Sequence, residues 1–117
     1  METKQPDVYA SQLASQLRKG YLTYCVLLIC REQPVYSSDI IRRLHDVDMM
    51  VVEGTMYPLL SRLQRDGLLV HEWQESEQGP PRKYYRSTEF GDGVREQLAK
   101  HVNELHKTLT QLKKETI

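Results

Sequence analysis

Side chains that bond phosphate oxygens and base edges recur between residues 54 and 65 of this sequence. An apolar i, i+3, i+4, i+7 stripe predicts that one side of a helix here is buried, and it consists of Met56, Leu59, Leu60 and Leu63. The side left facing outward holds Gly54, Thr55, Pro58, Ser61, Arg62 and Arg65, with Tyr57 at its boundary. Hydroxyl and guanidinium groups on one helical face suit the major groove of DNA. An ordinary solvated helix face is the alternative.

A second group of candidates follows the turn-prone stretch Gly79-Pro80-Pro81. Arg82 and Lys83 come directly after this turn, where their charges could meet a flanking phosphate or a minor groove. Tyr84 and Tyr85 alternate across a strand, so one is expected to pack inward while the other faces outward, and Tyr85 is included among the DNA contacts.

Residue types that carry catalysis or bind metals lack a suitable pattern. The histidines at 45, 71, 101 and 106 are scattered, and Cys25 and Cys30 lie inside an apolar stretch where small core side chains are expected. No paired nucleophile and base and no phosphate-binding glycine loop is evident, so we expect no enzyme, no metal and no cofactor.

The length and composition restrict which classes of protein this chain can belong to. A chain of 117 residues allows one domain, and no signal peptide or membrane-spanning run is evident, so a cytoplasmic protein is expected. Sixteen basic and sixteen acidic side chains give a net charge of zero, which argues against a protein that coats nucleic acid nonspecifically. Any positive field that faces DNA must therefore be local.

The elements that would position these residues are three helices and a hairpin. A first helix is expected from about residue 8 to 31, capped by Asp7, with one buried face made of Leu13, Leu17, Tyr21, Tyr24, Cys25, Leu28 and Ile29. A short second helix begins at Ser37 or Ser38, either of which could cap it, and ends near residue 45. The third runs from about Glu53 to Asp66, and Pro58 should stand near its start.

Two strands, 68–73 and 82–87, should then form a hairpin with a long tip, with Trp73 as a core anchor. This order predicts a mainly α fold with a small β-hairpin wing, a winged helix-turn-helix over residues 1–87. Residues 88–117 should form a long C-terminal helix within the same structural unit. Its 4, 3, 4, 3 apolar spacing predicts a dimer seam of Leu98, Val102, Leu105, Leu109 and Leu112. The alternative is a helix packed on its own domain.

The sequence resembles the PadR family of transcriptional regulators from Leu17 to about Leu105, and its short subgroup in particular. The matching segments are Leu17-Arg18-Lys19-Gly20, the run from Glu53 to Leu63, Gly67-Leu68, Trp73, the run from Gly79 to Tyr85, and Thr88-Glu89-Phe90-Gly91. Two departures are visible. Tyr36-Ser37-Ser38-Asp39-Ile40 stands where the family usually has Tyr-Gly-Tyr-Glu-Ile, so the aromatic phosphate contact that the resemblance implies there is replaced by the hydroxyls of Ser37 and Ser38, which can still reach a phosphate. Val102 stands where many members have a tryptophan.

The resemblance implies a homodimeric repressor that binds a pseudo-palindromic DNA operator and responds to a small effector, such as a phenolic acid or a flat cationic drug. An effector is expected between the first helix and the partner's last helix, near Leu22, Thr23, Leu27, Ala99, Val102 and His106. A packed interface without a pocket is the alternative there. From another class, a winged-helix protein-interaction module also suits the zero net charge, but it would not need Arg82, Lys83 and a hydroxyl-rich helix.

Overall fold

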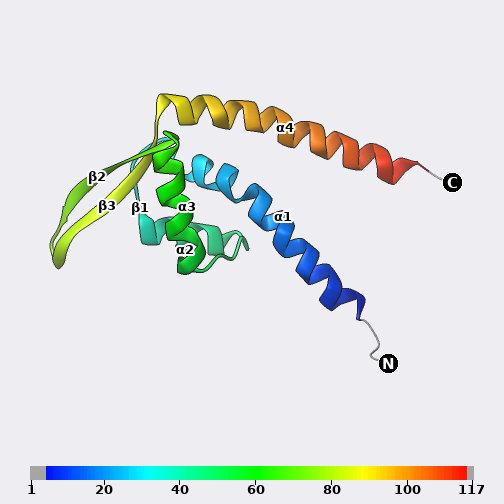
Figure 1. The fold of residues 1–117 in the computed structure, drawn as a ribbon, viewed down its shortest axis with the longest axis horizontal. Helices are drawn as coiled ribbons and strands as arrows, with labels where there is room; N and C mark the ends of the chain where they lie inside the picture. Colours follow the sequence, from blue (N-terminus) through cyan, green and yellow to red (C-terminus); the bar gives the residue numbers. More distant parts are fainter. Residues whose placement is uncertain (1–4, 116–117) are drawn as a thin grey trace.

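The computed structural model describes residues 5–115. The first four residues of the predicted segment 1–87 and the last two of the predicted segment 88–117 lie outside the described residues. Within that range the protein is mainly helical, with a three-stranded antiparallel sheet in the order β1-β3-β2 (Figure 1). The elements are α1 (Pro6–Ile29), β1 (Val35–Tyr36), α2 (Ser37–Asp46), α3 (Glu53–Arg65), β2 (Leu69–Ser76), β3 (Gly79–Ser87) and α4 (Glu89–Lys114). The predicted fold class is confirmed. No helix between residues 5 and 115 is long and apolar enough to cross a membrane.

The start of α1 differs in detail from the prediction. Gln5 rather than Asp7 is the N-cap, and Pro6 occupies the first turn, where a missing amide hydrogen costs nothing. The capping prediction for α2 is also wrong, because its N-cap is Tyr36 and no side chain caps it. Ser37 and Ser38 already belong to the helix.

Two features define α3. Pro58 lies inside the helix, five residues after its first residue Glu53, and therefore deeper than the first-turn position that the sequence suggested. Proline there leaves the carbonyl of Gly54 without its helical donor, a cost that the exposure of residue 54 allows water to offset. The helix ends as predicted near Asp66 and Gly67, because Gly67 takes φ +85° and the amide of Leu68 bonds the carbonyl of Leu63.

The sheet contains one strand that the sequence analysis missed. β1 is only two residues long and pairs with β3, so that Tyr36 lies opposite Tyr84. A two-residue strand has no alternation to detect, which is why pattern analysis could not find it. On the other side β2 and β3 form the predicted hairpin, which extends away from the helices (Figure 1).

The core joins α1, α2, α3 and the base of the sheet. All four residues of the stripe predicted for α3 are buried, at 7% exposure or less. In α1, however, the predicted inward face is only partly correct. Cys25 and Ile29 pack against the core, but the buried residues are Leu22, Val26 and Leu27, and Leu13 and Leu17 are 50% and 65% exposed. The helix carries two apolar faces, and only one of them packs on its own domain.

The two long helices extend beyond this body. α1 and α4 diverge from it as two arms, with the first residue of α1, Pro6, and the last residue of α4, Lys114, at their free ends (Figure 1). The radius of gyration is 17.6 Å, compared with about 13 Å expected for a compact domain of this length. A single chain therefore leaves much of both arms without a packing partner.

Candidate nucleic-acid interface

The outward face of α3 has the composition that the sequence predicted. Thr55, Pro58, Ser61 and Arg62 are exposed, and Tyr57 is 39% exposed at the edge of the face. Because α3 packs its opposite side on the core, these groups project from the body as a single ridge. A helix presented in this way can enter a major groove.

A cleft of about 550 Å³ separates α3 from the wing and brings together residues from five elements. Its lining consists of Tyr36, Ser37, Tyr57, Ser61, Trp73, Ser76, Gln78, Gly79, Pro80, Pro81, Arg82, Lys83 and Tyr85. Six of the predicted DNA contacts thus share one concave surface: Ser37, Tyr57, Ser61, Arg82, Lys83 and Tyr85. Thr55, Pro58 and Arg62 are not among these lining residues.

Aromatic rings position the two wing cations. The Arg82 guanidinium carbon lies 4.9 Å from the centre of the Tyr36 ring, and the Lys83 ammonium lies 5.4 Å from the centre of the Tyr85 ring. Such contacts orient a cation without neutralising it. No acidic residue is among the described residues that line the cleft, although the chain carries sixteen. The positive charge that the overall balance conceals is therefore local.

Two of the predicted contact residues need correction. Tyr85 is 4% exposed and belongs to the core, because it alternates with Tyr84 across β3 and takes the inward position. Its ring cannot serve as a DNA contact, while Tyr84 lies on the other face, beside Tyr36 at 5.6 Å between ring centres. Ser37 is also buried, at 8% exposure, which leaves Ser38 as the accessible hydroxyl at the start of α2.

Trp73 is a candidate that the sequence analysis assigned wrongly. It was expected to anchor the core, yet it is 63% exposed and lines the cleft. Trp73 shares the inward face of the hairpin with His71 and lies opposite Lys83, but at this distance from the body that face no longer meets the core. The wing is longer than the core beneath it, and strand alternation alone does not reveal where the core ends.

The residues predicted for the dimer seam and the effector site differ in how far they are exposed. Leu105, Leu109 and Leu112 are half-exposed on α4, whereas Leu98 packs partly against the chain's own core. Leu27 is fully buried in that core, so it cannot line a pocket against a partner's helix, and Leu22 is 6% exposed and lines hollows beside α3 of its own chain. That part of the effector prediction is wrong. Thr23, Ala99 and Val102 are half-buried, and His106 is exposed.

The cysteines and histidines show no reactive or metal-binding arrangement in the described part of the chain. Burial raises the pKa of the Cys30 thiol to about 12 and also raises the pKa of Cys25, so both stay protonated and unreactive near neutral pH. Among residues 5–115 no three His, Cys, Asp or Glu side chains lie close enough together to hold a metal ion.

Three helices, a hairpin wing and an acid-free cleft beside the third helix define a winged helix-turn-helix protein of the DNA-binding type. Residues 26–100 match the "Transcriptional regulator PadR-like family". The chain belongs to this family, whose members are DNA-binding transcriptional regulators and not enzymes.

Solved structures agree with this assignment. The chain is similar to a PadR-like transcription factor from Bacteroides fragilis, with 48% identity and a TM-score of 0.72 over 86% of this chain and 98% of that one. A PadR family regulator from Eggerthella lenta gives 33% identity and a TM-score of 0.86 over 94% and 96%. A PadR-like regulator from Bacillus cereus gives 31% and 0.78 over 86% and 99%. None of the curated proteins matches this chain.

Proposed function

We propose that this protein is a homodimeric repressor that binds a pseudo-palindromic operator, with α3 of each copy in the major groove and each wing against the flanking backbone. The observation that carries the proposal is the cleft between α3 and the wing, where Tyr57, Ser61, Arg82 and Lys83 meet on a surface whose described lining holds no carboxylate. Base edges would be read by the uncharged polar side chains of α3, which are Thr55, Tyr57 and Ser61, and phosphates would be held by the wing cations.

The dimer part of the proposal rests on the two arms. Apolar side chains about half-exposed run along α1 and along α4, and in water such stripes favour a second copy. A two-fold dimer would place the two α3 helices on one face of the duplex. Half-sites should then lie about ten base pairs, or about 34 Å, apart from centre to centre.

A selection experiment tests the DNA proposal. The protein is incubated with a library of random duplexes and with the DNA upstream of its own gene, and bound duplexes are enriched and sequenced. We expect a palindromic motif with the spacing given above. A folded dimer that enriches no motif and shows no salt-dependent DNA binding would instead support the protein-interaction module.

We also propose that an effector binds between the arms, near Ala99, Val102 and His106, where a shift would change the distance between the two α3 helices. The coupling needs only about 1 to 3 kcal/mol. Titration of the protein and of Val102→Trp with planar aromatic cations and with phenolic acids tests this. Tight binding by the parent with no gain from the tryptophan would contradict stacking, and no binding by either would favour a packed interface.

A further inference from the structure

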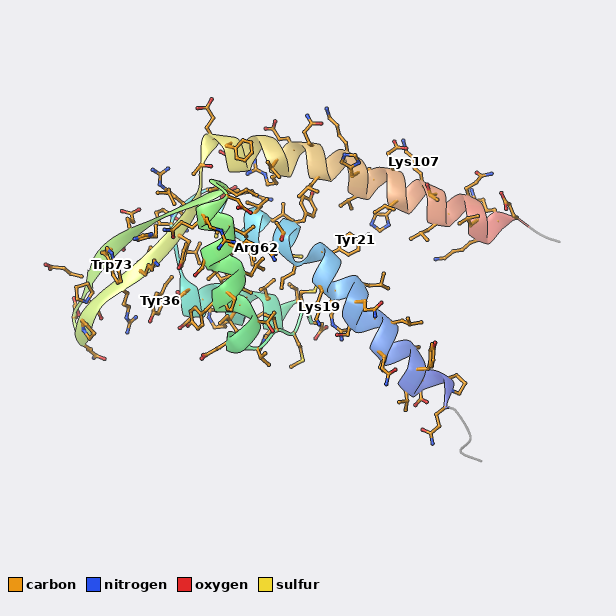
Figure 2. All side chains as sticks on the ribbon, in the orientation of Figure 1. Lys19, Tyr21, Tyr36, Arg62, Trp73 and Lys107 are labelled. Atoms are coloured by element: carbon orange, nitrogen blue, oxygen red, sulfur yellow. The ribbon has the colours of Figure 1, made fainter. Side chains whose placement is uncertain are left out.

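The side of α3 that faces away from the wing also carries a cationic groove. This groove has a volume of about 370 Å³ and lies between α1 and α3. It is lined by Lys19, Leu22, Thr23, Thr55, Pro58, Leu59 and Arg62. Lys19 also lines a neighbouring hollow of about 260 Å³, together with Arg18, His45 and the turn between α2 and α3. Figure 2 labels Lys19 on α1 and Arg62 on α3.

The charges of this groove are not neutralised within the chain. Lys19, Arg18 and Arg62 are exposed, and none of them forms an ion pair with another described residue. Neither hollow has an acidic residue in its described lining. Some exposed cations elsewhere do have acidic partners: Arg42 pairs with Asp39 and Asp46, and Lys107 lies 3.8 Å from Glu104.

The position of the groove relative to α3 suggests its partner. Thr55, Pro58 and Arg62 face α1, whereas Tyr57 and Ser61 face the wing, so the α3 ridge has an acid-free cationic surface on each side. A helix inserted in a major groove has one phosphate backbone on each side of it, because the two strands form the two walls of the groove. The wing can reach only one of these walls.

We infer that Lys19 of α1 and Arg62 of α3, assisted by Arg18, form a second phosphate-binding surface for the DNA strand opposite the one held by the wing. The inference rests on the proposed function and extends it to an element outside the helix-turn-helix and wing. α1 thereby has two roles on two faces: its buried side supports α3, and its cationic edge lies beside the N-terminal half of α3. Neither residue reads bases, so both contribute equally to all sequences.

The test measures DNA affinity against salt for Lys19→Gln, for Arg62→Gln and for the double variant. The probes are fluorescein-labelled duplexes, one selected by the wild-type protein and one scrambled. Because each change is present in both copies of the bound dimer, each single change should flatten the slope of log affinity against log salt by about 1.8 units, and the double change by about 3.6 units. Both probes should be affected alike. Lys107→Gln is the matched control and should leave the slope unchanged.

Phosphate ethylation interference then locates the contacts. Ethylation of phosphates on the strand opposite the wing should weaken wild-type binding and should have no effect on the double variant. If the wild type binds DNA and Arg82→Gln flattens the slope but Lys19→Gln and Arg62→Gln do not, the second surface is refuted while the proposed function stands. If the wild type shows no salt-dependent binding to either probe, the proposed function itself fails.

Discussion

The roles of the side chains on α3 depend on their direction around the helix axis more than on their chemical type. Thr55 and Ser61 both carry a hydroxyl, yet Thr55 lines the groove beside α1 and Ser61 lines the cleft beside the wing. The 100° step between successive helical residues separates Tyr57 from Pro58 in the same way. Each residue can therefore be assigned to one wall of a bound major groove.

The single tryptophan of the chain gives a direct test of the wing cleft. Trp73 is 63% exposed and lies in the cleft, so a duplex bound there should dehydrate its ring and shift or quench its fluorescence. Trp73→Ala should weaken binding by about tenfold or less, the loss of one aromatic contact of about 1 kcal/mol, and Trp73→Phe should lose less. Fluorescence of the protein and anisotropy of a labelled duplex are measured in parallel. Binding seen by anisotropy without any change in tryptophan emission would remove Trp73 from the interface.

Close packing at a glycine gives a second test at this scale. Gly91 in α4 is buried, and a Cβ atom there would overlap the backbone carbonyl of Leu68. Gly91→Ala should therefore lower the free energy of unfolding by about 1 to 3 kcal/mol, because backbone must move. Gly93→Ala is the control, since a Cβ there meets nothing within 4 Å and should stabilise the helix by up to about 1 kcal/mol. Equal effects in thermal denaturation would refute the close approach.

Some of these residue assignments could be predicted from the sequence, and others could not. Periodicity correctly separated the buried side of α3 from its exposed side, because a helix packed on one core has one apolar stripe. It failed for Tyr85 and Trp73, since both lie on the same face of the hairpin and only their distance from the body decides their burial. That distance depends on tertiary packing, which an alternating pattern does not encode.

At the scale of elements, the helices and the hairpin were predictable because chain breakers and periodicity act locally, although the caps predicted for α1 and α2 were wrong. The order of helices and wing strands was predicted correctly. The C-terminal end of α3 also agrees with the prediction that Gly67 stops the helix. Pro58 shows where local sequence signals are not enough. It lies inside α3 because the tertiary packing of four α3 side chains outweighs one lost helical hydrogen bond. In α1 the pattern was ambiguous, because the helix has one apolar face for its own core and another that the single chain leaves exposed.

One carboxylate, that of Asp92, contributes to the junction between β3 and α4. Asp92 accepts hydrogen bonds of 2.6 Å from the Ser87 hydroxyl and from the Arg95 guanidinium. The Ser87 bond first, and then Arg95, hold the pKa of Asp92 below its usual range. A lowered pKa in the folded state means that the stabilisation is present above the unfolded-state pKa and is lost as the pH falls through the folded-state pKa.

Asp92→Asn should accordingly lower the free energy of unfolding at neutral pH by no more than about 1 kcal/mol, because the carboxylate is partly exposed. The difference from wild type should shrink in acid, where the wild-type carboxyl is also uncharged. Thermal unfolding of both proteins between neutral pH and the acid range measures it. Glu96→Gln, an exposed carboxylate on the same helix, is the control. A difference that stays constant down to strong acid would show that charge at Asp92 is not the cause.

At the scale of the whole molecule, the arms α1 and α4 carry apolar stripes that have no packing partner within a single chain. Figure 2 shows Tyr21 on the side of α1 that faces α4, and Lys107 on the side of α4 that faces away from α1. Spacing places Leu105, Leu109 and Leu112 opposite Lys107 around α4, which directs them toward the space between the arms. Each arm of a second copy carries the same stripe. A two-fold pairing would bury all four stripes at once.

The dimer is therefore tested best on α4. The double change Leu105→Lys/Leu109→Lys places two charges in the apolar stripe, where burial against a partner would leave them unpaired. We expect the mass of one chain by light scattering, or an unfolded chain, and loss of the preference for paired half-sites over one half-site. The wild type should have the mass of two chains and an unfolding midpoint that rises with protein concentration. Asn103→Lys/Thr110→Lys adds the same charges to the opposite side of α4 and should leave the dimer intact. A folded, tight dimer from the leucine double variant would show that this stripe is not the seam.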